Sequence, residues 1–260
     1  MSGTMTETAF QLDEEIQREL DAYYEQVVTE DDQPVDNFFS SKQQRLLAQT
    51  LYASWMPPAG KGQTSGQKRP FLADTNIGIF YVMGEPPIVP DFFLSLDVQP
   101  RPDWYEKKNR SYFVWELGKA PEVVVEIVSN REGGELDRKL EKYARLGALY
   151  YVVYDPQLKL KGDALRVFVL RDGEYQELER PYLSRAGLGL KLWDGVFEDK
   201  EDTWLRWCDA QGNIIPTGEE RARTEAERAD HEATARQEAE DRAAQLAAKL
   251  RELGVDPDQL

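Results

Sequence analysis

The sequence of 260 residues contains one cysteine, Cys208, and one histidine, His231. A single cysteine excludes an internal disulfide and any zinc site built on cysteines. His231 falls in a polar stretch near the carboxyl end, where we expect it to be solvated, so neither a Ser-His-Asp triad nor another histidine-paired site is expected. Hydrolytic chemistry in this chain would therefore depend on carboxylates and a hard metal ion.

Basic residues are also scarce, since 32 Lys and Arg stand against 48 Asp and Glu, for a formal net charge of −16. This balance excludes a broadly basic surface for nucleic acid. Residues 1–40 carry a net charge of −10 and residues 219–260 one of −5, which leaves −1 for residues 41–218. Acidic ends of this kind are typical of solvated, solubilising helices. A DNA partner would have to bind a local surface of the nearly neutral middle.

Long hydrophobic runs are missing. No stretch approaches the roughly 18 uncharged apolar residues of a membrane-spanning helix. The amino terminus shows neither the basic nor the apolar region of a signal peptide. We therefore expect a cytoplasmic protein with no membrane partner.

Hydrophobic residues make up 41% of the chain and aromatic residues 11%, which is enough for a sizeable core. Hydrophobic periodicity predicts a mixed α/β body. Helices are expected over residues 14–29, 40–55 and 137–146, with Ser40 and Ser41 as the candidate N-caps of the second. Strands are expected over residues 77–83, 88–96, 123–128, 150–154, 165–170 and 175–178. The first two would begin a meander, and the last two would form a hairpin across Arg171-Asp172-Gly173.

Composition divides the chain into three parts: an acidic helical flank (1–36), an α/β domain with an added carboxy-terminal β segment (37–215), and a helical tail rich in Ala, Glu and Arg (216–260). Apolar residues recur at helical spacing in the tail, but a six-residue step from Ala233 to Ala239 breaks the heptad pattern. We interpret the tail as one long helix that allows a short coiled coil and a homodimer without requiring either.

Three residues could together perform chemistry. Glu126 interrupts a β-branched run that otherwise reads as a buried strand, Asp91 follows Pro90 at the start of another strand, and Lys139 lies on the next helix. Neighbouring strands lie about 4.8 Å apart, so two carboxylates on them can share one ion. Carboxylates that hold Mg²⁺, with a nearby ammonium that stabilises the charge on phosphorus, are what metal-assisted phosphodiester cleavage requires.

Structural alternatives exist for each of these residues. Glu126 could be neutralised by Arg131 or Lys139 in a purely structural salt bridge, because a buried carboxylate needs a partner. Asp91 could simply cap a turn after Pro90.

Helical spacing places Lys139 on one stripe with Glu135 and Tyr143, four residues away on either side. The plain alternative is a surface pair between Glu135 and Lys139. Lys142 is a second candidate lysine, but it lies off this stripe.

Four motifs occur in a fixed order between residues 35 and 200. They are Ile88-Val89-Pro90-Asp91-Phe92-Phe93, Pro121-Glu122-Val123-Val124-Val125-Glu126-Ile127-Val128-Ser129-Asn130, Lys139 with Tyr143 and Gly147, and Tyr150-Tyr151-Val152-Val153-Tyr154-Asp155-Pro156. The series resembles the Uma family of restriction endonucleases, which is abundant in cyanobacteria and was first catalogued as a domain of unknown function. That family is placed in the PD-(D/E)XK nuclease superfamily.

The resemblance implies a restriction-endonuclease-like core, with a mixed β-sheet flanked by helices. It also implies metal ligation by Asp91, Glu126 and the backbone carbonyl of Ile127. The superfamily lysine two residues after the second acid is replaced here by Val128, and the resemblance makes Lys139 its substitute. An acid common in the first helix of the superfamily has no match, and Gln43, Gln44 and Gln49 are the only candidates at that place.

One cluster interleaves basic and aromatic residues and could contact a DNA backbone. It comprises Trp104, Tyr105, Lys107, Lys108, Arg110 and Tyr112. An exposed loop of ordinary composition is the alternative.

The sequence hypothesis is an endonuclease that hydrolyses DNA with Mg²⁺, or Mn²⁺ in its place. Asp91 and Glu126 would bind the ion and Lys139 would stabilise the transition state. Two other hypotheses stay open: an inactive nuclease fold that binds DNA or a protein, and a scaffold that assembles partners or a homodimer through its tail.

Overall fold

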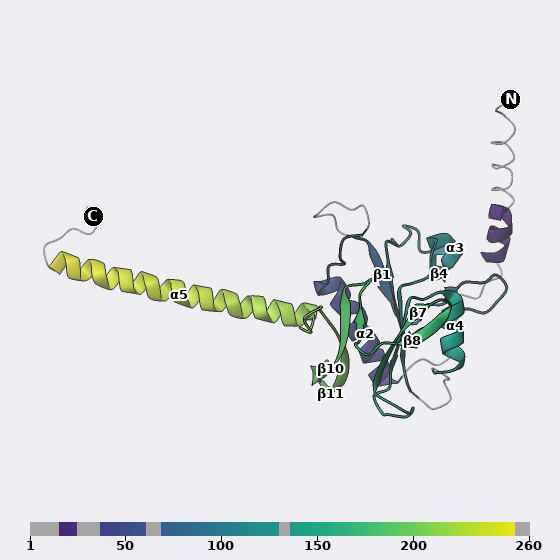
Figure 1. Ribbon diagram of the computed structural model, residues 1–260. Coiled ribbons are helices and arrows are strands. Elements are labelled where there is room, and N and C mark those ends of the chain that lie inside the picture. Colours follow the sequence, from purple (N-terminus) through teal and green to yellow (C-terminus); the bar gives the residue numbers. More distant parts are fainter. Residues whose placement is uncertain (1–15, 25–36, 61–68, 130–135, 253–260) are drawn as a thin grey trace. The chain divides into compact units, whose positions relative to one another are not determined.

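The structure is a computed structural model that describes residues 16–24, 37–60, 69–129 and 136–252 (Figure 1). The chain divides into two compact units, residues 1–215 and residues 216–260. The first unit contains the β-sheets and the candidate site. The second contains helix α5 (Gly218–Glu252).

A six-stranded mixed sheet forms the centre of the first unit, in the strand order β1-β3-β5-β6-β7-β8. The strands are β1 (Phe71–Asp74), β3 (Phe92–Leu96), β5 (Val123–Ile127), β6 (Tyr150–Tyr154), β7 (Leu165–Arg171) and β8 (Glu174–Glu177). β5 and β6 run parallel, and the other neighbouring pairs run antiparallel. The arrangement confirms the mixed α/β class expected from the sequence.

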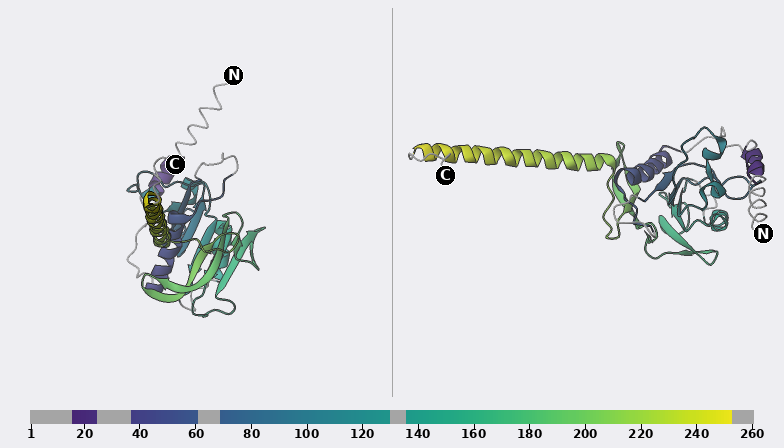
Figure 2. Two further views of the ribbon diagram at one scale, coloured as in Figure 1. Left: turned by 90° about the vertical axis from the view of Figure 1, so that its left-hand side faces the viewer. Right: turned by 90° about the horizontal axis from the view of Figure 1, so that it is seen from above.

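One face of this sheet packs against helix α2 (Phe38–Ser54) and a three-stranded sheet in the order β11-β10-β9. The small sheet consists of β9 (Tyr182–Leu183), β10 (Leu188–Phe197) and β11 (Lys200–Cys208). Helix α2 contacts β11 on one side and β1 and β3 on the other (Figure 2). The indole N–H of Trp207 donates a 3.0 Å hydrogen bond to the carbonyl of Leu47, which joins β11 to α2.

The other face carries helix α4 (Arg138–Leu146) and a short parallel pair, β2 (Ile79–Phe80) and β4 (Tyr112–Phe113) (Figure 1). Tyr143 and Leu146 of α4 pack with Val124 and Val153 of the sheet. Glu126 alternates with Val124 and Val128 along β5, so its side chain belongs to this second face.

Local signals account for several elements that the sequence predicted. β5 and β6 are buried along their whole length, as expected of β-branched and aromatic runs in a central parallel pair. α4 ends at Gly147, whose φ of 87° is left-handed and suits glycine. The β7–β8 hairpin turns through Asp172 and Gly173 with φ of 50° and 86°, which is the geometry of a type I′ turn.

Other expectations were wrong in detail. The N-cap of α2 is Asn37, whose side chain accepts the N–H of Ser40, and both Ser40 and Ser41 lie inside the helix. Most of the strand expected over 77–83 is irregular, because only Ile79 and Phe80 pair with β4. The first antiparallel partner of β3 is β1, which is not among the strands expected from the sequence.

Residues 16–24 form a helix, in agreement with the described part of the amino-terminal prediction. Tyr24, the last described residue of this segment, packs edge-on against Phe113 and donates a 2.6 Å hydrogen bond to Glu116 of helix α3 (Val114–Leu117).

Helix α5 confirms the long tail helix and carries ion pairs between residues four positions apart, such as Arg236–Glu240 at 3.0 Å. A coiled coil and a homodimer stay predictions. Among the described residues, no helix is both long and apolar enough to cross a membrane.

Candidate active site

Asp91 and Glu126 lie next to each other at the ends of β3 and β5. Phe92 pairs with Val125, so continuing this antiparallel register by one residue places Asp91 opposite Glu126. Side chains directly opposite each other in such a pair share a face and have Cβ atoms about 4.5–5.5 Å apart. The backbone N–H of Ile127 donates a 2.5 Å hydrogen bond to Asp91 Oδ2, which ties the aspartate to β5.

Helix α4 supplies two donors to Glu126, which is only 3% exposed. Lys139 Nζ lies 2.8 Å from Glu126 Oε2, and the Tyr143 hydroxyl donates to Glu126 Oε1 at 2.5 Å. Residues four apart on a helix share a stripe, which explains why both reach the same carboxylate. This contact agrees with the expected Lys139–Tyr143 stripe and equally with the structural salt bridge that the sequence left open.

The electrostatics of the site keep Tyr143 protonated. Burial, and next the charge and hydrogen bond of Glu126, raise the pKa of the Tyr143 hydroxyl well above its usual value of 10. The charge of Asp91 acts in the same direction. Tyr143 is therefore a permanent hydrogen-bond donor to Glu126 at physiological pH.

The other basic candidates do not reach this carboxylate or lie outside the described residues. Lys142 is exposed and lines a separate pocket of about 220 Å³ with Glu141 and Arg145. Arg131 and Glu135 fall outside the described ranges.

Of the three glutamines proposed for the place of the helix acid, the structure brings Gln44 to the site. Its Nε2 donates to Asp91 Oδ1 at 3.2 Å, and its Oε1 accepts a 3.0 Å bond from Asn76. Gln43 instead binds the backbone of Leu205 through both ends of its amide, and Gln49 is exposed. Asn76 was not singled out in the sequence, because its own neighbourhood carries no chemical signal.

The donor set suits a hard divalent cation. Carboxylate and carbonyl oxygens are the preferred ligands of Mg²⁺ and Mn²⁺. Within the described ranges no group of three or more His, Cys, Asp or Glu residues could hold a metal ion. A two-carboxylate site fits Mg²⁺ nonetheless, because this ion is usually bound by one or two carboxylates and completes its shell with water and substrate phosphate.

Comparison with protein-family models gives a match to Uma2, described as "Putative restriction endonuclease", over residues 14–190. The match covers more than half of the chain. The chain belongs to the Uma2 family. Among curated proteins no match is found.

Uma2 membership confirms the resemblance seen in the sequence, and it indicates a nuclease that acts on DNA. The matched region contains the pair of carboxylates, Lys139 and Tyr143 together with all six strands of the central sheet. Roles for individual residues in this Uma2 protein rest on the contacts described above.

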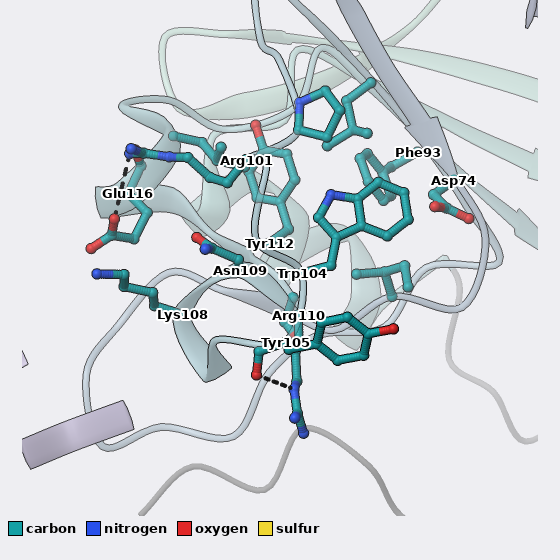
Figure 3. A pocket seen from close by; sticks show the side chains of 15 residues that line it. Asp74, Phe93, Arg101, Trp104, Tyr105, Lys108, Asn109, Arg110, Tyr112 and Glu116 are labelled. Carbon is teal, nitrogen blue, oxygen red and sulfur yellow. Dashed lines mark hydrogen bonds and ion pairs between the residues drawn. The ribbon is translucent and has the colours of Figure 1, made fainter. Parts of the chain in front are cut away.

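The basic and aromatic loop also has a defined place in the fold. Five of its six predicted residues line a cavity of about 610 Å³, and Lys107 is the exception. Lys107 begins the short 3₁₀ helix η1 (Lys107–Asn109). Figure 3 shows the cavity, with Asp74 on one side of the Trp104 indole and the pair of Arg101 and Glu116 on the other.

Proposed function

We propose that this protein is a metal-dependent endonuclease that hydrolyses phosphodiester bonds in DNA. The observation that supports it is that Asp91, immediately before β3, lies opposite Glu126 of β5, and that the Lys139 ammonium donates a hydrogen bond to Glu126. This arrangement corresponds to the two acids and the lysine of a PD-(D/E)XK core, except that the lysine comes from α4 because Val128 occupies its usual position.

Asp91, Glu126 and the carbonyl of Ile127 would hold Mg²⁺, or Mn²⁺ in its place. When bound, the ion would polarise the scissile phosphate and lower the pKa of a coordinated water. Asp91 is half-buried, which leaves part of its carboxylate open to solvent and ligands. Its Oδ2 is held by the Ile127 N–H, so the strand register orients the carboxylate.

Lys139 would stabilise the charge that develops on the transferred phosphate. Its side chain is 29% exposed, while that of Glu126 is 4% exposed, so the ammonium lies between the buried carboxylate and solvent. From this position it can contact a phosphate oxygen while it stays hydrogen-bonded to Glu126, and such a contact would stabilise the developing charge.

Gln44 and Tyr143 act as positioning residues. Gln44 is neutral where related nucleases carry an acid, so it orients Asp91 by donating a hydrogen bond and adds no negative charge. Fewer charges at this end of the site favour one bound ion over two. Tyr143 fixes Glu126 from the helix side.

The test is plasmid nicking with Mg²⁺ and with Mn²⁺, using Asp91→Asn, Glu126→Gln and Lys139→Ala. Asp172→Asn is a matched control, because Asp172 is exposed in the β7–β8 turn and asparagine tolerates its positive φ. We expect the three site variants to lose nicking and the control to keep it. Full activity in Asp91→Asn would refute the assignment.

One observation favours a second candidate, an inactive nuclease fold that binds a partner. Both oxygens of Glu126 already have donors, Lys139 and Tyr143, as a purely structural network would require. Calorimetric titration separates the two functions. Mn²⁺ binding that is lost in Asp91→Asn supports the nuclease, whereas absence of both binding and nicking supports the inactive fold.

A further inference from the structure

The cavity beside the basic and aromatic loop has an apolar floor and an exposed aromatic rim. Phe93 and Tyr112, each 1% exposed, belong to the floor and to the hydrophobic cluster on the same sheet face as Glu126. Trp104 and Tyr105 at the rim are 64% and 88% exposed. In the part of the chain that the structure describes, no aromatic ring stacks on either of them. Two large rings are thus held in solvent beside a cavity that could accept a planar group.

The charge around the cavity is opposite in sign to that of the whole protein. Three basic side chains, Arg101, Lys108 and Arg110, line the cavity against two acidic ones, in a chain of net charge −16. Local contacts hold the bases in place: Arg101 donates to the carbonyl of Glu116 at 3.0 Å, Arg110 donates to that of Tyr105 at 3.1 Å, and Lys108 pairs with Glu106 at 3.2 Å. Figure 3 shows Arg101, Lys108 and Arg110 around the aromatic rim.

Two acids, Asp74 and Glu116, also line the cavity. Asp74 accepts the N–H of Thr75 at 2.8 Å, and burial raises its pKa. Arg101 lies 3.5 Å from Glu116, so one of the two acidic charges is balanced by a base.

The cavity adjoins the pair of carboxylates through β1 and β3. Phe93 at its floor is two residues after Asp91, a separation of about 7 Å at roughly 3.3 Å per strand residue. Asp74 pairs with Phe93, and Asn76, two residues later, donates to the carbonyl of Pro90 and to Gln44. A nucleic acid strand rises about 3.4 Å per nucleotide. One strand bound at Asp91 would therefore reach the cavity within about two nucleotides.

We propose that this cavity binds an unpaired base of a DNA strand that lies across Asp91 and Glu126, with Trp104 and Tyr105 stacking on the base and Lys108 and Arg110 contacting adjacent phosphates. The proposal rests on the nuclease function and specifies its substrate as DNA with a single-stranded or unstacked segment. Aromatic rings stack on any base, so the cavity recognises strand state more than sequence.

The test is fluorescence anisotropy of a labelled oligothymidylate, free and annealed to its complement, in EDTA. EDTA removes divalent ions, so binding is measured apart from cleavage. Variants are Trp104→Ala, Tyr105→Ala and Lys108→Ala. Phe38→Ala is the matched control, because Phe38 is 92% exposed and does not line the cavity.

We expect the wild type to bind the single strand more tightly than the duplex. Loss of one stacking ring should weaken single-strand binding on the order of tenfold. Lys108→Ala should reduce the slope of log K against log salt by about 0.7, the value for one phosphate contact on a single strand. The Phe38→Ala control should bind like the wild type.

Preference for the duplex, or single-strand affinity in Trp104→Ala and Tyr105→Ala equal to that of Phe38→Ala, would overturn the proposal. Plasmid nicking with Mn²⁺ on the same variants distinguishes this failure from failure of the nuclease function. If the wild type nicks but does not prefer the single strand, the nuclease stands and the base-binding cavity falls. If it binds the single strand through Trp104 but never nicks, the cavity stands and the nuclease falls.

Discussion

Removal of the Lys139 ammonium should destabilise the protein and at the same time improve divalent-ion binding. Breaking a fully buried ion pair costs about 3–5 kcal/mol, and losing a surface pair about 0–1 kcal/mol. The pair between Lys139 and Glu126 is intermediate, because Glu126 is buried while the lysine side chain is 29% exposed and water can enter in its place. Tyr143 still donates to Glu126. We therefore expect Lys139→Ala to lower the free energy of unfolding by about 2 kcal/mol.

Thermal unfolding in EDTA measures the first effect. A domain of about 150–250 residues loses roughly 2–4 °C per kcal/mol, so the expected drop in Tm is about 4–8 °C. Lys142→Ala is the matched control, because Lys142 is exposed on the same helix and makes no contact with Glu126. Its Tm should stay near the wild-type value.

Repeating the measurement with Mn²⁺ tests the site itself. A ligand that binds only the folded state stabilises it, by about 2.7 kcal/mol at a concentration one hundred times Kd. In Lys139→Ala the ammonium no longer competes with Mn²⁺ for Glu126. Mn²⁺ should therefore raise the Tm of this variant more than that of the wild type. Adding Asp91→Asn should abolish the rise. A Mn²⁺ effect in Lys139→Ala no larger than in Lys142→Ala would refute the reasoning.

Three further predictions concern polar side chains elsewhere in residues 1–215 as well as at the site. Gln43→Ala should lower the free energy of unfolding, measured by urea titration, by about 2–4 kcal/mol, because the buried N–H and carbonyl of Leu205 lose their partner. The control Gln49→Ala should change the free energy of unfolding little. The hydrogen bond from Arg45 lowers the pKa of Glu198 to about 2. The charged Glu198 therefore adds a small amount to the free energy of unfolding above about pH 4.5, and this amount is lost as pH falls toward 2. Glu198→Gln should make the free energy of unfolding less dependent on pH over that interval. Burial raises the pKa of several tyrosines above 10, so their neutral hydroxyls stabilise the fold fully below pH 10 and this stabilisation is lost at higher pH. In an alkaline titration, tyrosinate absorbance should therefore rise only together with unfolding, which circular dichroism monitors. These tyrosines are Tyr24, Tyr112, Tyr143, Tyr154 and Tyr175.

Elements with strong local signals could be predicted from the sequence. The β-branched run of β5 favours a buried strand wherever it packs, and Gly147 permits the left-handed backbone that ends α4. The Asp172-Gly173 turn allows one hairpin geometry and so determines the pairing of β7 with β8. In each case the residues that decide the structure are neighbours in the chain.

Elements that depend on distant partners were missed or misplaced. β1 is only four residues long and exists because it pairs with β3. Ile79 and Phe80 form a strand by pairing with Tyr112 and Phe113, which lie more than thirty residues later, while the nearer Ile88 contributes a single bridge to Ile79. A short segment has too little intrinsic preference to specify a strand, so the pairing decides its conformation.

The candidate site divides in the same way. The sequence alone singled out Glu126, because a carboxylate inside an apolar strand must have a partner, and helical spacing supported Lys139 as that partner. The resemblance to the Uma family added Asp91 as the other acid and favoured Lys139 over Lys142. Only the tertiary structure decided that Gln44, not Gln43 or Gln49, reaches Asp91. Likewise, only the structure brought the loop at 101–110 over the sheet residues that floor the cavity. Contacts between side chains far apart in sequence arise from the packing of whole elements, and no local pattern of residues encodes that packing.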